Sequence, residues 1–119
     1  MEINDLLKMT LIRANRWHNG GIKEWSALEW AGAMAGEAGE AANAAKKLKR
    51  LEGSFRTINE EGRHYETTQA ASLAVAKEVA DTIIYGLLLM ARVGIDDPES
   101  VIREVFNKKS EEYGFPERI

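Results

Sequence analysis

The spacing of apolar side chains predicts a helix at the start of the chain. They recur every three or four residues from about Asn4 to Arg16, which is the period of one helix face. Asn4 or Asp5 can cap its beginning, because a short polar side chain accepts hydrogen bonds from free backbone N–H groups. The segment WHNGG that begins at Trp17 contains paired glycines, which are poor helix formers, and it predicts the end of this helix.

A second helix is predicted from Ser26 to about Leu51, where Gly53 ends it. Ser26 and Glu29 match the capping box, in which the two side chains satisfy free N–H groups reciprocally. The middle of this helix is rich in Ala and Gly, although each Gly costs roughly 1 kcal/mol relative to Ala. Close packing against a neighbouring helix explains such a composition. A functional account adds that a bare surface beside Glu37 and Glu40 leaves room for metal, water and phosphate, and both accounts can hold together.

The segment from Gly53 to about Glu66 is polar and aperiodic, so it predicts a surface loop. Thr67 or Thr68 then caps a third helix, which is expected to run to Val93, with Gly94 just past its end. This helix has a wide apolar stripe made of Leu73, Ala76, Ala80, Ile83, Ile84, Leu87, Leu88 and Ala91.

The pair Asp97-Pro98 predicts the start of a fourth helix, since Pro is favoured at the first helical position after a cap. The helix is expected to continue to about Tyr113, before Gly114 and Pro116. No stretch has the period of a strand, so the sequence predicts an all-α fold, a four-helix bundle in one domain over residues 1–119. The apolar faces of the two central helices are wider than one small chain can cover, which predicts dimerisation.

Composition narrows the functional classes. The 119 residues carry a net charge of -3 and no cysteine. Disulfides, thiolate zinc sites and Cys nucleophiles are therefore excluded. Binding to a nucleic-acid polymer or a membrane surface is not indicated, because such proteins are usually basic. The start lacks a signal-peptide pattern, and the longest apolar run is too short to span a bilayer, so a cytoplasmic location is expected.

Two short acidic motifs are the main candidates for chemistry. GEAGE contains Glu37 and Glu40, and KEVAD contains Glu78 and Asp81. Residues three apart share one helix face, with Cβ atoms roughly 5–6 Å apart. Carboxylates among apolar positions reduce the stability of the fold unless a positive charge pairs with them. Mg²⁺ is such a partner, since it prefers oxygen ligands. The sequence therefore predicts that both pairs face each other and bind metal. Solvated acids on exposed faces are the structural alternative.

Two other kinds of catalytic site find little support. A di-iron bundle needs a Glu-x-x-His pair on each of two helices, but the string from Glu61 to His64 occurs once, contains glycine and lies in the polar loop. A catalytic triad needs a histidine beside a nucleophile, and neither histidine has that context.

Several further side chains are candidates for substrate contacts. Lys47 is seven residues after Glu40, near the same helix face, and is the candidate for phosphate. Tyr85 is one turn after Asp81, where its hydroxyl can reach a phosphate or sugar, or can cap the core. Trp25 can stack on a base, as can Trp17 and Trp30 near the same loop, although buried tryptophans often anchor turns. His18 lies beside them and is likewise a candidate for a substrate contact.

These motifs resemble those of the MazG-like, all-α NTP pyrophosphohydrolase superfamily. That group is marked by Glu-x-x-Glu on one helix and Glu-x-x-Asp on the next, matched here by Glu37/Glu40 and Glu78/Asp81. The contexts GEAGEAANAAKK and KEVADTIIYGLLL, and the tail FNKKSEEYGFPERI, also look like those of the family. The resemblance covers the second to the fourth predicted helix. The long segment from Leu51 to Gln69 departs from it and is expected to form a lid or to extend a dimer contact.

The resemblance implies hydrolysis of a nucleoside triphosphate between its α- and β-phosphates, with Mg²⁺, or Mn²⁺ as the alternative ion, held by the four acids. By the same analogy, one glutamate helps to orient or deprotonate the attacking water. Tyr85, Arg103 and Asn107 would contact the substrate, and the neighbouring Lys108 would help to bind phosphate. A homodimer or homotetramer is implied, with two subunits closing the site. The alternative is a helical dimerisation or adaptor module that kept the fold and lost activity.

Overall fold

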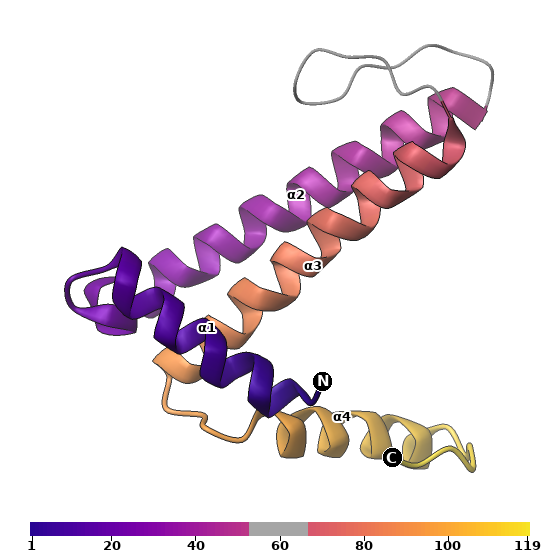
Figure 1. Ribbon diagram of the computed structural model, residues 1–119. Helices are drawn as coiled ribbons and strands as arrows, with labels where there is room; N and C mark the ends of the chain where they lie inside the picture. The colour runs from indigo at the N-terminus through magenta and orange to yellow at the C-terminus, as the bar shows by residue number, and fades with distance from the viewer. Residues whose placement is uncertain (53–66) are drawn as a thin grey trace. The chain divides into compact units, whose positions relative to one another are not determined.

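The computed structural model describes residues 1–52 and 67–119, and it is all-α (Figure 1). Within these ranges the chain forms four α-helices and one short 3-10 helix, with no strand. The elements are α1 (Ile3–Trp17), η1 (Gly21–Glu24), α2 (Ala27–Glu52), α3 (Thr68–Arg92) and α4 (Pro98–Glu112). The fold class predicted from the sequence is confirmed.

The chain divides into two compact units. One comprises Met1–Ala27 and Leu87–Ile119, so it holds α1, η1, the end of α3 and α4. The other comprises Leu28–Gly86, so its described part is most of α2 and α3. The single domain expected over residues 1–119 stays a prediction.

The predicted signals at the ends of α3 are confirmed. Thr67 Oγ1 accepts a hydrogen bond from the backbone N–H of Ala70 at 3.0 Å, so Thr67 caps the helix. After the last helical residue, Gly94 has a φ of 94°, a left-handed conformation that favours glycine. Ile95 N–H then donates to the carbonyl of Met90 at 2.9 Å, which satisfies one of the free carbonyls at the helix end.

The start of α4 also follows the prediction. Asp97 is the N-cap residue and Pro98 is the first helical residue. One carboxylate oxygen of Asp97 accepts from the backbone N–H of Ser100 at 3.2 Å, and the other accepts from its hydroxyl at 2.6 Å. The helix ends at Glu112, and Gly114 follows with a φ of 69°.

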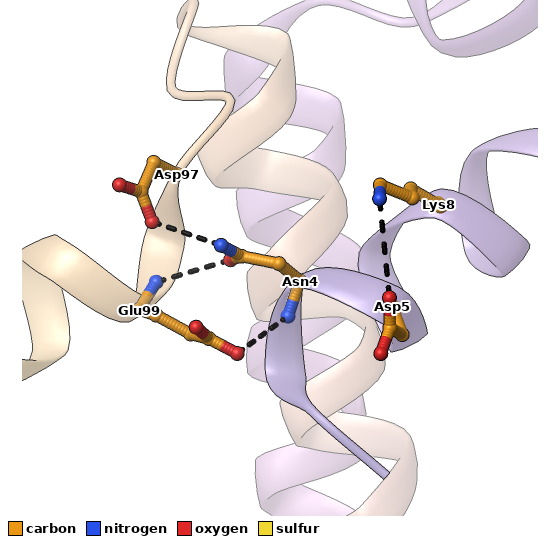
Figure 2. Close-up of polar contacts among 5 residues, drawn as sticks. All are labelled: Asn4, Asp5, Lys8, Asp97 and Glu99. Atoms are coloured by element: carbon orange, nitrogen blue, oxygen red, sulfur yellow. Dashed lines mark hydrogen bonds and ion pairs between the residues drawn. The ribbon is translucent and has the colours of Figure 1, made fainter.

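The predicted cap of α1 is wrong. Glu2 occupies the N-cap position and makes no side-chain capping bond, while Asn4 lies inside the helix. Asn4 Nδ2 donates instead to Asp97 Oδ1 at 2.9 Å, and its Oδ1 accepts from the backbone N–H of Glu99 at 3.3 Å (Figure 2). The Asn4 N–H in turn donates to Glu99 Oε1 at 3.1 Å. The Asn4 side chain and backbone N–H thus bind residues more than 90 positions away in the chain, and the side chain does not cap its own helix.

The turn between α1 and α2 contains a 3-10 helix that the sequence did not indicate. Its first residue, Gly21, is buried and has a φ of 60°. The Gly21 N–H donates to the carbonyl of His18 at 2.9 Å. α2 begins directly after Ser26, as predicted, whereas its predicted stop at Gly53 lies outside the described residues.

The core contains few large side chains. Among the described residues, the buried apolar ones are Leu7, Ala14, Trp30, Ala44, Ala71, Leu87 and Leu88. The predicted apolar stripe of α3 is buried only in part, because Leu73 and Ile83 stay more than half exposed. No helix in the described ranges combines the length and hydropathy needed to cross a membrane.

Candidate metal site

Helices α2 and α3 run antiparallel in the unit Leu28–Gly86. The ring of Trp30 on α2 lies 6.1 Å from the ring of Tyr85 on α3, centroid to centroid. Seven residues further along α2, Glu37 lies beside Glu78, which is seven residues earlier on α3. Residue numbers therefore fall on one helix as they rise on the other, as Figure 1 shows for the two long helices. This arrangement brings the two acidic motifs to the same level.

Three carboxylates from the predicted acidic set come together at this level. The residues are Glu37, Glu78 and Asp81, and each has a carboxylate oxygen that lies within 4.8 Å of a carboxylate oxygen of each of the other two. Glu37 and Glu78 are half-buried, and Asp81 is exposed. Glu78 and Asp81 are three residues apart on α3 and so share one face, while Glu37 approaches from α2. The cluster is close enough for a single cation to contact all three side chains.

Like charges at this spacing repel one another. Two unit charges about 4 Å apart interact by roughly 1 kcal/mol in water and roughly 4 kcal/mol near a protein surface. Within residues 1–52 and 67–119, neither Glu37 nor Asp81 makes an ion pair with a basic side chain. A divalent cation would therefore turn a repulsive arrangement into an attractive one.

Glu40, the fourth predicted acid, is not part of this cluster. It lies on α2 three residues after Glu37, and it is exposed. Of the four acids that the sequence predicted in one site, the structure thus brings three together. The role of Glu40 stays a prediction.

The glycines of α2 leave open space beside the cluster. A Cβ atom added to Gly36 or Gly39 would meet no other heavy atom within 4 Å, and the same holds for Gly32. Close packing within the described chain therefore does not explain these glycines. On α3, a Cβ at Gly86 would make an ordinary van der Waals contact with Met34 Sδ, at 3.5 Å. The other account, in which a bare surface leaves room for metal, water and phosphate, stays a prediction for α2.

Two candidate substrate residues belong to the same unit as the cluster. Tyr85 is half-buried, and its ring is tilted 41° against that of the fully buried Trp30. This contact favours the core role for Trp30 over base stacking, while the Tyr85 hydroxyl stays a candidate. Lys47 is half-buried on α2, and its phosphate role stays a prediction.

The candidates near the first turn interact with one another. His18 Nδ1 lies 2.5 Å from Glu24 Oε2, and the His18 ring meets that of Trp25 edge to face at 4.9 Å. Trp25 also accepts a hydrogen bond at its carbonyl from Arg92 Nε, at 2.8 Å. Trp17 is exposed, with the guanidinium of Arg13 4.9 Å from its ring. The His18–Glu24 pair was not predictable from residue spacing, because a turn with a short 3-10 helix joins the two residues.

The candidates on α4 belong to the other unit. Arg103 and Lys108 are exposed. Asn107 binds the backbone of Ile119 twice: its Nδ2 donates to the Ile119 carbonyl at 3.1 Å, and its Oδ1 accepts from the Ile119 N–H at 2.9 Å. The sequence did not predict this contact. A substrate bound by the Asn107 amide would have to displace it.

Several predictions fall on residues outside the described ranges, among them the surface loop expected from Gly53 to about Glu66. The string from Glu61 to His64 lies there entirely, as does most of the segment from Leu51 to Gln69 that was expected to act as a lid or dimer contact.

No protein-family model matches the sequence, and neither a curated protein nor a solved structure matches the chain. The resemblance to the MazG-like superfamily therefore stays an expectation that rests on the residues quoted for it.

Proposed function

We propose that this protein is a divalent-metal-dependent nucleoside triphosphate pyrophosphohydrolase. The observation that supports this best is the convergence of Glu37, Glu78 and Asp81, from two helices, to within 4.8 Å. Neighbouring glycines leave the surface beside them open. The proposal includes a cytoplasmic location, as expected from the sequence.

The donor set favours a hard cation. All three ligand groups are carboxylates, and Mg²⁺ prefers oxygen ligands together with several waters and substrate phosphates. Mn²⁺ accepts the same ligands and is the natural substitute. Glu37 and Glu78 are half-buried, so their side chains are more restricted than those of fully solvated acids, and they would hold the ion most firmly.

The reaction is hydrolysis of one phosphoric anhydride bond. A water oxygen bonds to the α-phosphorus, the bond from that phosphorus to the bridging oxygen breaks, and the products are a nucleoside monophosphate and pyrophosphate. When bound, a divalent cation lowers the pKa of its water and neutralises charge on the leaving group. One glutamate of the acidic set would orient the water or accept the proton that it loses, and the other carboxylates would hold the metal ion. Lys47 and Tyr85, and on α4 Arg103, Asn107 and Lys108, are the proposed substrate contacts.

We further propose that the active form is a homodimer or homotetramer. On α3, Leu73, Ala76, Ala80 and Ile83 are all exposed and follow the three–four spacing of a helix-pairing seam. On α2, Leu28 is 81% exposed. A second copy of the chain would cover these apolar side chains and could complete the site.

The test is to offer the full chain a panel of canonical, deoxy and modified nucleoside triphosphates and to identify the products by ³¹P NMR. We expect pyrophosphate and a monophosphate with Mg²⁺ or Mn²⁺ and none with a chelator. Release of inorganic phosphate alone would contradict cleavage at the α–β bond. No product from any nucleotide, with folded protein and metal present, would favour the adaptor module instead.

A further inference from the structure

A cavity of about 490 Å³ lies in the unit formed by Met1–Ala27 and Leu87–Ile119. Its walls come from α1, η1 and the segment where α3 ends. Leu7, Leu11, Ile22 and Ile95 supply an apolar lining. Binding sites for small organic molecules in proteins are typically of this size and have mostly apolar walls. None of the residues proposed for nucleotide hydrolysis lines it.

Hydrogen bonds between distant segments fix two walls of this cavity. Asn4, a lining residue, bonds through its side chain to Asp97 and Glu99, so the start of α1 is tied to the start of α4 (Figure 2). Arg92, another lining residue, donates to the carbonyl of Trp25 at 2.8 Å and ties the end of α3 to the residues after η1. These bonds fix the positions of Asn4 and Arg92 before any ligand binds, and a preorganised wall lowers the entropic cost of binding.

The polar side chains that line the cavity are mainly cationic. Lys8, Lys23 and Arg92 contribute positive charge, and Asp96 contributes one negative charge. Lys8 also pairs with Asp5 at 3.9 Å, but both side chains are more than half exposed, so this pair is weak. Lys23 makes no ion pair or hydrogen bond through its side chain within the described part of the chain. The lining is thus positive in a protein whose net charge is -3.

We propose that this cavity binds an amphipathic carboxylate, with its hydrocarbon body among Leu7, Leu11 and Ile95 and its carboxylate at Lys8 and Lys23. Burial of hydrocarbon contributes roughly 0.8 kcal/mol per CH₂ group, and the lysines select the sign of the head group. A nucleotide fits this cavity less well, because the mostly apolar lining offers few hydrogen-bond partners for a polar base and a sugar.

The probe is decanoate, followed in ¹H–¹⁵N NMR spectra of the full-length protein. The cation decyltrimethylammonium has the same hydrocarbon body and serves as the matched control. We expect saturable shifts of amide signals from residues around the cavity, and binding of the cation at least about tenfold weaker, which corresponds to roughly 1.4 kcal/mol. Equal binding of both compounds would overturn the proposal. The absence of any decanoate-induced shift at these residues would also overturn it, and this is the result expected if a second copy of the chain fills the cavity.

Three variants locate the site. Lys23→Glu is expected to weaken decanoate binding about tenfold or more, because it reverses a charge at the lining. Lys49→Glu makes the same change at an exposed position on α2 and is expected to stay within about twofold of the wild type. Ala91→Leu narrows the cavity and is expected to reduce binding of both compounds. Equal loss in the two glutamate variants would show that net charge, rather than this cavity, controls binding, and would overturn the proposal.

Discussion

Asp97 stabilises the start of α4 through its charged form. Hydrogen bonds from the side chains of Ser100 and then Asn4, and from the Ser100 backbone, lower the pKa of Asp97 below its ordinary value of 3.8. When the pKa of a carboxylate is lower in the folded state than in the unfolded state, its charge stabilises the fold, and this contribution is fully present at pH values above the unfolded-state pKa. That contribution is lost as the pH falls from about 3.8 through the lower, folded pKa.

The variant Asp97→Asn tests this dependence. Asn is also a good N-cap residue, so the helix start is kept while the charge is removed. We expect the variant to unfold at a lower temperature than the wild type at neutral pH, and the difference to shrink as the pH falls below 3.8. Asp96→Asn removes an equal charge from a neighbouring exposed position and is the control. A difference that does not change with pH would contradict the assigned role of the Asp97 charge.

Two glycine positions should respond oppositely to alanine. At Gly21 the φ of 60° is left-handed, and an added Cβ would overlap Asn15 Oδ1. Gly21→Ala should therefore lower the free energy of unfolding by roughly 1–2 kcal/mol from the backbone alone. Gly39 is in the middle of α2 with open space around it, so Gly39→Ala should raise that free energy by up to about 1 kcal/mol. Urea unfolding of both variants measures this, and a stabilising Gly21→Ala would contradict the turn geometry.

The side chain of Asn4 makes hydrogen bonds that link α1 to the start of α4. Asn4 makes two side-chain hydrogen bonds to α4 and its cap residue, whereas the adjacent Asp5 makes only an exposed pair with Lys8 (Figure 2). Asn4→Ala should therefore reduce the free energy of unfolding by about 1–3 kcal/mol. Asp5→Ala should change it by less than about 1 kcal/mol. Equal effects in urea unfolding would show that the Asn4 bonds do not hold the two helices together.

The helix boundaries that the sequence predicted well are those set by local chemistry. Thr67, Asp97-Pro98 and Gly94 act within a few residues of their own position, so their roles follow from the order of residues alone. Asn4 also looked like a local cap, but its partners lie on α4. The 3-10 helix at Gly21 was missed because four residues give no periodic pattern.

The candidate site was predictable to a similar extent. The spacing of Glu78 and Asp81 places them on one helix face, and the second motif suggested a facing helix. Residue spacing alone does not predict how α2 and α3 are aligned along their axes. This alignment decides that Glu37 joins the cluster while Glu40 does not. The contact between Asn107 and Ile119 depends equally on tertiary structure.

At the scale of the whole molecule, the exposed seam on α3 predicts self-association. Leu73 is 56% exposed and Ile83 is 52% exposed, and both follow the seam's spacing. Leu73→Lys would place a charge in a contact between two copies, so we expect sedimentation velocity to show a shift from oligomer to monomer. Met9→Lys adds the same charge on α1, at another exposed apolar side chain, and should keep the oligomer. A wild-type chain that stays monomeric at all accessible concentrations would contradict this prediction.

The most direct test of the proposed hydrolase is the rate of pyrophosphate release by Glu78→Gln at saturating Mg²⁺ with the best nucleotide of the panel. This change keeps the size of the side chain and removes one charge from the cluster of Glu37, Glu78 and Asp81. Glu111→Gln, at an exposed position on α4, is the matched control. We predict a loss of about 100-fold or more in Glu78→Gln and a rate close to that of the wild type in Glu111→Gln. Equal, undiminished rates in both variants would contradict a metal centre at this cluster.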